Sequence, residues 1–194
     1  MLYDGPGADA DDVFTELFGA PGLTLDGWSI TGTNGATGSV YRTIDLTGAV
    51  IQADGILVIA TDLALGSVFD ARDFIANVDW QNGPDSIQLL DNFAMVVDSL
   101  QYGDAGSFNR GEGLYSMDVA AGHSLSRNIF GLDTDDNRSD FIDLSSATPG
   151  IGPAIASVPE PGSLILMTLG MFGLFANGRL QHNRQACRQR SNRY

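Results

Sequence analysis

The chain has 194 residues, of which 43% are hydrophobic, so it can bury a core and is too apolar to be disordered throughout. Its formal net charge of −14 argues against a nucleic-acid partner, because a phosphate backbone repels an acidic surface. The charge is divided unevenly: residues 1–160 carry all 24 carboxylates and five arginines, whereas residues 161–194 carry five arginines and no acidic residue. This asymmetry predicts two parts that meet different surroundings.

Short apolar runs separated by turn residues dominate the chain from residue 13 to residue 141. Runs of this length, with Asp-Gly and Asn-Gly pairs between them, are typical of an all-β sandwich of about seven strands. Segment 56–60 is apolar throughout, which predicts a central strand covered on both faces. Segment 95–102 alternates only in part, which predicts a strand with one wetter face. The predicted strands are 13–18, 28–31, 40–46, 56–60, 86–90, 95–102 and 124–129.

Helical periodicity is weak before residue 160. The nearest candidate is 70–75, which is too short to form a stable helix by itself. The first domain is therefore predicted to be a β-sandwich over residues 1–148.

The composition changes after this domain. Residues 149–161 are rich in proline and glycine, which predicts an extended linker. Residues 162–178 carry no charge and predict one short transmembrane helix, with a buried core helix as the alternative. The tail 179–194 is basic and, by the positive-inside rule, would lie in the cytoplasm, with the first 160 residues outside. Its arginines are Arg179, Arg184, Arg188, Arg190 and Arg193.

The order of these features, with Pro159, Glu160 and Pro161 before an apolar span and then arginines, resembles the PEP-CTERM sorting signal of Gram-negative bacteria. The resemblance implies that a membrane exosortase recognises the Pro-Glu-Pro motif, removes the span and releases or transfers the protein outward. It also implies a bacterial cell-envelope precursor whose mature form is at the cell surface or secreted. The arginine region of this chain is longer and more dispersed than in that family.

The first domain resembles the lamin-tail domain, an immunoglobulin-like β-sandwich also found in bacterial secreted proteins. The similar pieces occur in the family's order, and they imply the same fold for residues 1–148. The family opens with one more strand ahead of the position of Leu2, so we expect a truncated first strand, with that strand and a signal peptide encoded upstream of Met1. The similar pieces are 13–17, 25–30, 54–59, 86–89, 97–102, 124–127, 137–141 and 148–150.

One acidic loop predicts a calcium site. Oxygen-bearing side chains stand at alternate positions there, which is the spacing by which a single loop wraps Ca²⁺. The loop lacks the glycine and the distal glutamate of an EF-hand, and a purely structural role is the alternative. The candidate ligands are Asp133, Asp135, Asn137 and Ser139.

Catalytic patterns are not evident. His123 is the only histidine before the tail, no G-x-S-x-G elbow is present, and Cys187 is the only cysteine. We therefore predict that the chain is not an enzyme and has no cofactor other than the candidate Ca²⁺. The favoured hypothesis is an exported surface or matrix protein that binds a polysaccharide or another surface protein. The alternatives are a calcium-dependent adhesion module and a fragment of a longer secreted nuclease- or hydrolase-associated protein.

Two further sets of residues leave alternatives open. Glu16 and Asp98 lie in predicted strands, where Arg127 could pair with either, or all three could face solvent. Trp28, Tyr41 and Trp80 could form a sugar-stacking surface or belong to the core; the core is favoured for Trp28.

Overall fold

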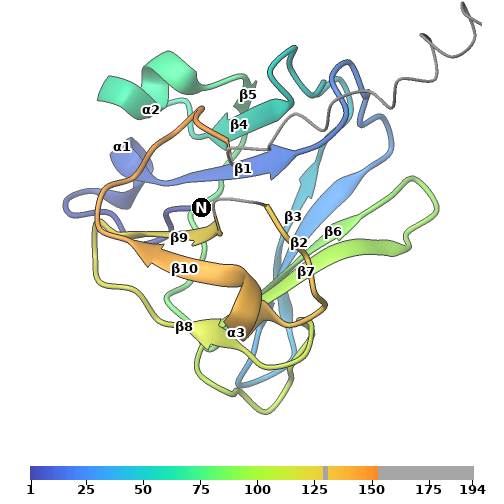
Figure 1. Ribbon diagram of the computed structural model, residues 1–194, viewed down its shortest axis with the longest axis vertical. Helices are drawn as coiled ribbons and strands as arrows, with labels where there is room; N and C mark the ends of the chain where they lie inside the picture. Colours follow the sequence, from blue (N-terminus) through green and yellow to red (C-terminus); the bar gives the residue numbers. More distant parts are fainter. Residues whose placement is uncertain (129–130, 153–194) are drawn as a thin grey trace, which may run out of the picture. The chain divides into compact units, whose positions relative to one another are not determined.

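The computed structural model describes residues 1–128 and 131–152 (Figure 1). The chain divides into two compact units, residues 1–155 and 156–194, and all strands and helices of the described ranges lie in the first unit. The Pro-Glu-Pro motif, the predicted membrane span and the basic tail lie outside the described residues. Within the described ranges, no helix is both long enough and apolar enough to cross a membrane.

The described part is mostly β-sheet with a few short helices, consistent with the predicted all-β sandwich (Figure 1). The largest sheet has the order β3-β2-β6-β7-β8: β3 (Val40–Asp45), β2 (Ser29–Asn34), β6 (Asp85–Leu90), β7 (Val96–Gly103) and β8 (Ser116–Met117). The smaller sheets are β1 (Phe14–Phe18), β4 (Ile56–Ala60) and β5 (Phe74–Ile75), and β9 (Ser124–Arg127) with β10 (Phe141–Leu144). The helices are α1 (Asp9–Asp12), α2 (Gly66–Ala71) and α3 (Asn137–Asp140).

Each predicted strand corresponds to an observed one, namely β1, β2, β3, β4, β6, β7 and β9. Strands β5, β8 and β10, which are two to four residues long, were not predicted. The helical candidate 70–75 is divided between the end of α2 and β5. Segments of two to four residues are too short to display a period of two, so these elements depend on their neighbours for their conformation.

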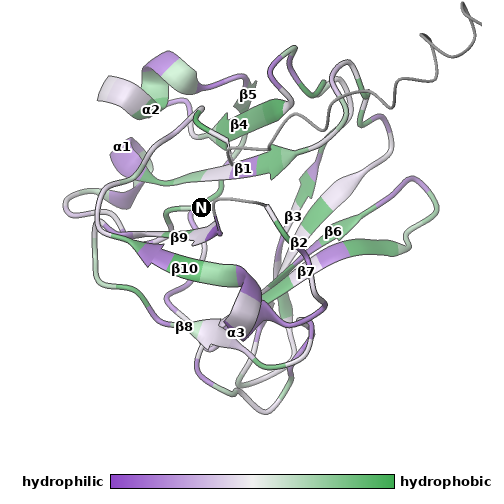
Figure 2. Cartoon of the chain, viewed as in Figure 1, coloured by the Kyte–Doolittle hydropathy of each residue, from purple (hydrophilic) through white to green (hydrophobic). Residues whose placement is uncertain are grey.

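Strand β4 is the centre of the core. All five of its residues are buried, as the apolar run predicted, and β1 and β5 flank it on its two edges within the sheet. Figure 2 shows hydrophobic colour along β4, with hydrophilic colour in many of the loops. Strand β7 is exposed at its start and buried from Ser99 to Tyr102, so its wetter part is one end rather than one face.

The first two residues connect two sheets. Leu2 and Phe14 exchange backbone hydrogen bonds of 2.9 and 3.1 Å, so the N-terminal segment pairs with β1. Met1 and Leu125 likewise exchange backbone hydrogen bonds of 2.8 Å each, so the same segment pairs with β9. Residues 1–2 therefore act as a short strand between the β1-β4-β5 sheet and the β9-β10 pair.

Candidate functional site

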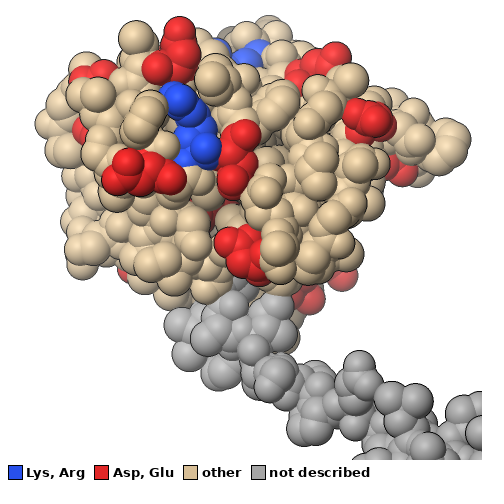
Figure 3. Space-filling model, turned by 90° about the horizontal axis from the view of Figure 1, so that it is seen from above, with Lys and Arg blue, Asp and Glu red and all other residues tan. Residues whose placement is uncertain are grey.

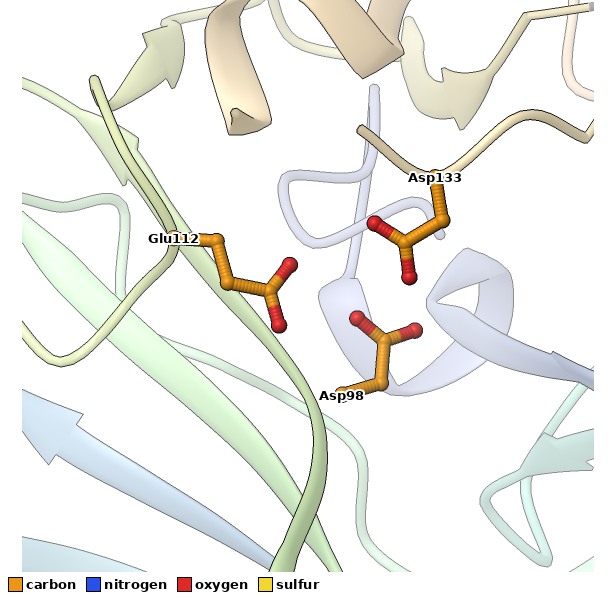
Figure 4. A group of neighbouring side chains, drawn as sticks. All are labelled: Asp98, Glu112 and Asp133. Carbon is orange, nitrogen blue, oxygen red and sulfur yellow. The ribbon is translucent and has the colours of Figure 1, made fainter. Parts of the chain in front are cut away.

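Three carboxylates from distant parts of the sequence converge beside β9. Asp98 lies on β7, Glu112 in the loop that precedes β8, and Asp133 in the loop that precedes α3. An oxygen of each lies within 4.8 Å of an oxygen of the others, and Figure 4 shows the three carboxylate groups pointing toward one another. We call these three residues the carboxylate cluster. Like charges at this separation repel, so a nearby positive charge is needed to stabilise them.

Arg127 supplies that charge. Its Nη2 lies 2.7 Å from Asp98 Oδ1, and its Nη1 lies 3.4 Å from both Asp133 Oδ1 and Asp140 Oδ2. The guanidinium carbon also lies 4.8 Å from the centre of the Phe141 ring, within the range of a cation–π contact. Of the alternatives that the sequence left open for Arg127, the structure shows the pair with Asp98.

Glu112 is the least satisfied member of the carboxylate cluster. Its Oε1 accepts hydrogen bonds from the Ser99 backbone N–H at 3.2 Å and from the Ser99 hydroxyl at 3.4 Å. Its Oε2 is buried and has no hydrogen-bond partner among the described residues. Burial, with the nearby charges of Asp98 and Asp133, raises the pKa of Glu112 above its ordinary value, against the opposing effect of Arg127.

Asp140 is buried beside the same arginine and behaves in the opposite way. Burial alone would raise its pKa, but hydrogen bonds from Thr134 and from the Asp136 backbone, together with the charge of Arg127, lower the pKa below its ordinary value. The Thr134 hydroxyl donates to Oδ1 at 2.7 Å and the Thr134 N–H to Oδ2 at 2.9 Å. Asp140 was not among the predicted site residues, although it follows the acidic loop directly.

The predicted calcium ligands separate into different environments. Asn137 is fully buried: its Oδ1 accepts hydrogen bonds from the N–H groups of Gln101 and Glu112, and its Nδ2 donates to Ser99 O. Ser139 Oγ donates to Asp136 Oδ2 at 3.2 Å. An amide oxygen that already accepts two hydrogen bonds has no further lone pair for a cation.

The two remaining candidates lie on the surface side of this loop. Asp133 Oδ1 accepts from the Asp135 N–H at 3.2 Å and also faces Arg127. Asp135 is exposed and has a φ of 56°, in the left-handed region that aspartate tolerates better than most residues. The structure therefore brings Asp133 to Asp98 and Glu112, and Ca²⁺ binding by the loop stays a prediction.

A groove with a cavity of about 320 Å³ lies beside the carboxylate cluster. Its apolar lining comes from strands of more than one sheet, and Met1, Ile151 and Gly152 also line it. Charged residues also line it, so apolar and acidic side chains share one cavity. The apolar lining includes Leu17, Ile30, Ile87, Leu89, Leu100 and Leu125, and the charged lining is Glu16, Asp98, Arg127 and Asp133.

His123 and the aromatic residues have structural contacts. His123 Nδ1 lies 2.8 Å from Asp143 Oδ1 across the β9-β10 pair, and within the described ranges it contacts no hydroxyl or thiol that could serve as a nucleophile. Trp80 is only 1% exposed and donates to Thr15 Oγ1 at 2.8 Å. Trp28 packs against the core, as predicted. That the chain is not an enzyme stays a prediction.

The surface is acidic over a wide area. Figure 3 shows one face on which red carboxylate atoms recur while blue basic atoms are few. This distribution agrees with the charge of the first 160 residues, where arginines are greatly outnumbered. A surface of this kind favours neutral or cationic partners.

Comparison with known families identifies the PEP-CTERM protein-sorting motif at residues 157–179. The match includes Pro159, Glu160 and Pro161 and ends at Arg179, which confirms the predicted sorting signal. No curated protein and no solved structure matches the chain. The PEP-CTERM motif is that of an exported, envelope-associated protein processed by exosortase.

Proposed function

We propose that the chain is an exported, non-catalytic surface or matrix protein, delivered by exosortase, whose sandwich binds a polymer or another protein. The observation that carries the proposal is the sorting motif at residues 157–179. The acidic sandwich supports it, because an acidic surface is repelled by the phosphate backbone of nucleic acid and therefore favours other partners outside the cell.

The finer details belong to the same proposal. The sandwich is of the lamin-tail, immunoglobulin-like type, residues 162–178 form the membrane helix, and the arginines from Arg179 onward stay in the cytoplasm until processing. Neither alternative function gains support from a specific contact. The calcium-dependent adhesion module would need Asn137, whose amide oxygen already accepts two backbone hydrogen bonds.

The proposal is tested by surface accessibility. In a bacterium with a PEP-CTERM system, protease added to whole cells should digest the sandwich only when exosortase is present. The variant Glu160→Ala in the sorting motif should leave the domain inaccessible, whereas Glu112→Gln, which is outside the motif, should not. Equal digestion with and without exosortase would remove the basis of the proposal.

A further inference from the structure

Two Asn-Gly pairs of the sandwich lie next to each other but in different surroundings. The first, Asn34-Gly35, lies where β2 ends, and the second, Asn82-Gly83, lies in the turn that precedes β6. The N–H of the first glycine donates to the carbonyl of Pro84 at 2.7 Å, so the loop and the turn are in direct contact. A third pair, Asn177-Gly178, lies outside the described residues.

An Asn-Gly pair can lose ammonia without an enzyme. The glycine nitrogen gives up its proton to a base and attacks the side-chain amide carbon of the asparagine, and the side-chain nitrogen leaves as ammonia. Water then opens the cyclic imide at either carbonyl, which gives aspartate or isoaspartate, so water is consumed and ammonia is released. Glycine favours the reaction because it has no Cβ to shield its nitrogen.

The side chain of Asn34 is held in place by hydrogen bonds. Its Oδ1 accepts from the N–H groups of Ala36 and Thr37 at 3.0 Å each and from the Thr37 hydroxyl at 3.1 Å. Its Nδ2 donates to Gln81 Oε1 at 2.7 Å. The amide carbon can approach the next backbone nitrogen only after these bonds are broken, which lowers the rate of reaction.

The nucleophile of the same pair is also protected. Gly35 is buried, and its N–H donates both to Pro84 O at 2.7 Å and to Asp85 Oδ1 at 3.2 Å. A buried N–H that is held between two acceptors is not available to a base in solution. The fold therefore restrains both reacting groups of the first pair.

The second pair has neither restraint. Asn82 is exposed, and its side chain makes no hydrogen bond within the described ranges. The Gly83 N–H likewise has no hydrogen-bond partner in the part of the chain that the structure describes. A base can therefore reach this nitrogen, and the amide carbon of Asn82 can move toward it without breaking a hydrogen bond of the fold.

We propose that Asn82 is a site of spontaneous deamidation by water, and that the fold protects Asn34 from the same reaction. The modification adds a negative charge at position 82 in the aspartate and isoaspartate products alike. The inference is independent of the proposed function, because it rests on two turns of the sandwich and not on sorting or on a binding partner.

The isoaspartate product would also disturb the turn. In isoaspartate the main chain passes through the side-chain carbons, so it is longer by a methylene between positions 82 and 83. Gly83 is closely packed at this point: an added Cβ would lie 3.1 Å from the Tyr102 carbonyl oxygen and 3.2 Å from Gly103 Cα. The isoaspartate form, separated by chromatography, is therefore expected to unfold at a lower urea concentration than the asparagine form.

The test is peptide mapping of the full chain in detergent micelles, incubated at mildly alkaline pH. The chain has no lysine, so trypsin cuts only after arginine and puts Asn34 and Asn82 on separate peptides, residues 1–42 and 73–110. Mass spectrometry follows the mass gain that accompanies replacement of an amide by a carboxyl group, and fragment ions locate it and distinguish isoaspartate from aspartate. A zero-time sample corrects for reaction during digestion.

A parallel incubation in urea gives the rate at each asparagine in the unfolded chain, so that sequence effects cancel. The ratio of the folded rate to the unfolded rate should be at most about one tenth for Asn34, because its hydrogen bonds must open before it reacts. For Asn82 the ratio should lie within about threefold of unity, because no such opening is needed. The variant Asn82→Gln should remove the fast mass gain from peptide 73–110 and leave the rate at Asn34 unchanged.

Two results would overturn the inference. One is a ratio at Asn82 as low as the ratio at Asn34, which would mean that the fold protects both pairs. The other is a ratio at Asn34 as high as the ratio at Asn82, which would mean that the hydrogen bonds of the first pair give no protection. Neither measurement depends on exosortase, so the proposed sorting is tested separately.

Discussion

The Arg127 guanidinium lies 2.7 Å from the Asp98 carboxylate, and this pair connects β9 to β7 across the two layers of the sandwich. The same guanidinium approaches Asp133 and Asp140, so one cation stabilises three carboxylates from three parts of the chain. Asp140 is almost completely buried, whereas the Asp98 side chain is 41% exposed. The arginine is therefore expected to matter for stability mainly through its buried partner.

Replacing the arginine should be costly. Arg127→Met would leave the buried Asp140 without its cation, and the loss of one partner from a buried pair lowers the free energy of unfolding by about 3 kcal/mol. Asp98→Asn removes the exposed partner and should change stability by less than about 1 kcal/mol. Urea denaturation of both variants measures this, and equal losses would contradict the account.

Asn137 is expected to be a second point of stability. Its amide bonds Gln101 N–H and Ser99 C=O, which covers the outer edge of β7 in the way a neighbouring strand would. Asn137→Ala leaves buried backbone groups without partners and should lower the free energy of unfolding by about 3 kcal/mol.

The matched control is Ser139, another predicted calcium ligand, which is exposed. Ser139→Ala should stay within about 0.5 kcal/mol of the parent protein, as is usual for surface substitutions. If both variants were equally mild in thermal or urea unfolding, Asn137 would not protect the β7 edge.

The strands were easier to predict from the sequence than the carboxylate cluster, for a physical reason. Segment 56–60 is apolar at every position, so its burial follows from composition alone. Asp133 is more than thirty residues from Asp98 in sequence, and only the pairing of β9 with β10 and the course of the loops bring them together.

The role of Asn137 could not be predicted from local sequence for the same reason. An amide among acidic residues suggests a cation ligand from local spacing, whereas its partners on β7 are 36 and 38 residues away. The short strands β5 and β8 have two residues each, too few for any pattern.

The raised pKa of Glu112 predicts a pH effect on stability. The folded protein holds this proton more tightly than the unfolded chain, so ionisation of Glu112 lowers stability as pH rises from about 4.5 through the higher folded-state pKa. Glu112→Gln keeps the oxygen that accepts from Ser99 and removes the charge. The variant should therefore gain stability relative to the parent at pH 7 and lose that advantage near pH 4, which urea denaturation at the two pH values measures.

Asp140 should make the free energy of unfolding depend on pH in the opposite direction. Because its folded-state pKa is lowered, its contribution is present above the unfolded value of about 3.8 and is lost as pH falls through the folded value. Denaturation of Asp140→Asn between about pH 2 and pH 7 should show a deficit that narrows at the acidic end. A deficit independent of pH would assign its role to hydrogen bonding alone.

The central claim is that the sandwich is exported and sorted through the motif at residues 157–179. Its most direct test is the intact mass of the mature protein, expressed behind a signal peptide in a PEP-CTERM host with and without exosortase. The account predicts removal of the chain beyond the region of Pro159 to Pro161 only when exosortase is present. Full-length protein in the membranes of both strains would contradict it.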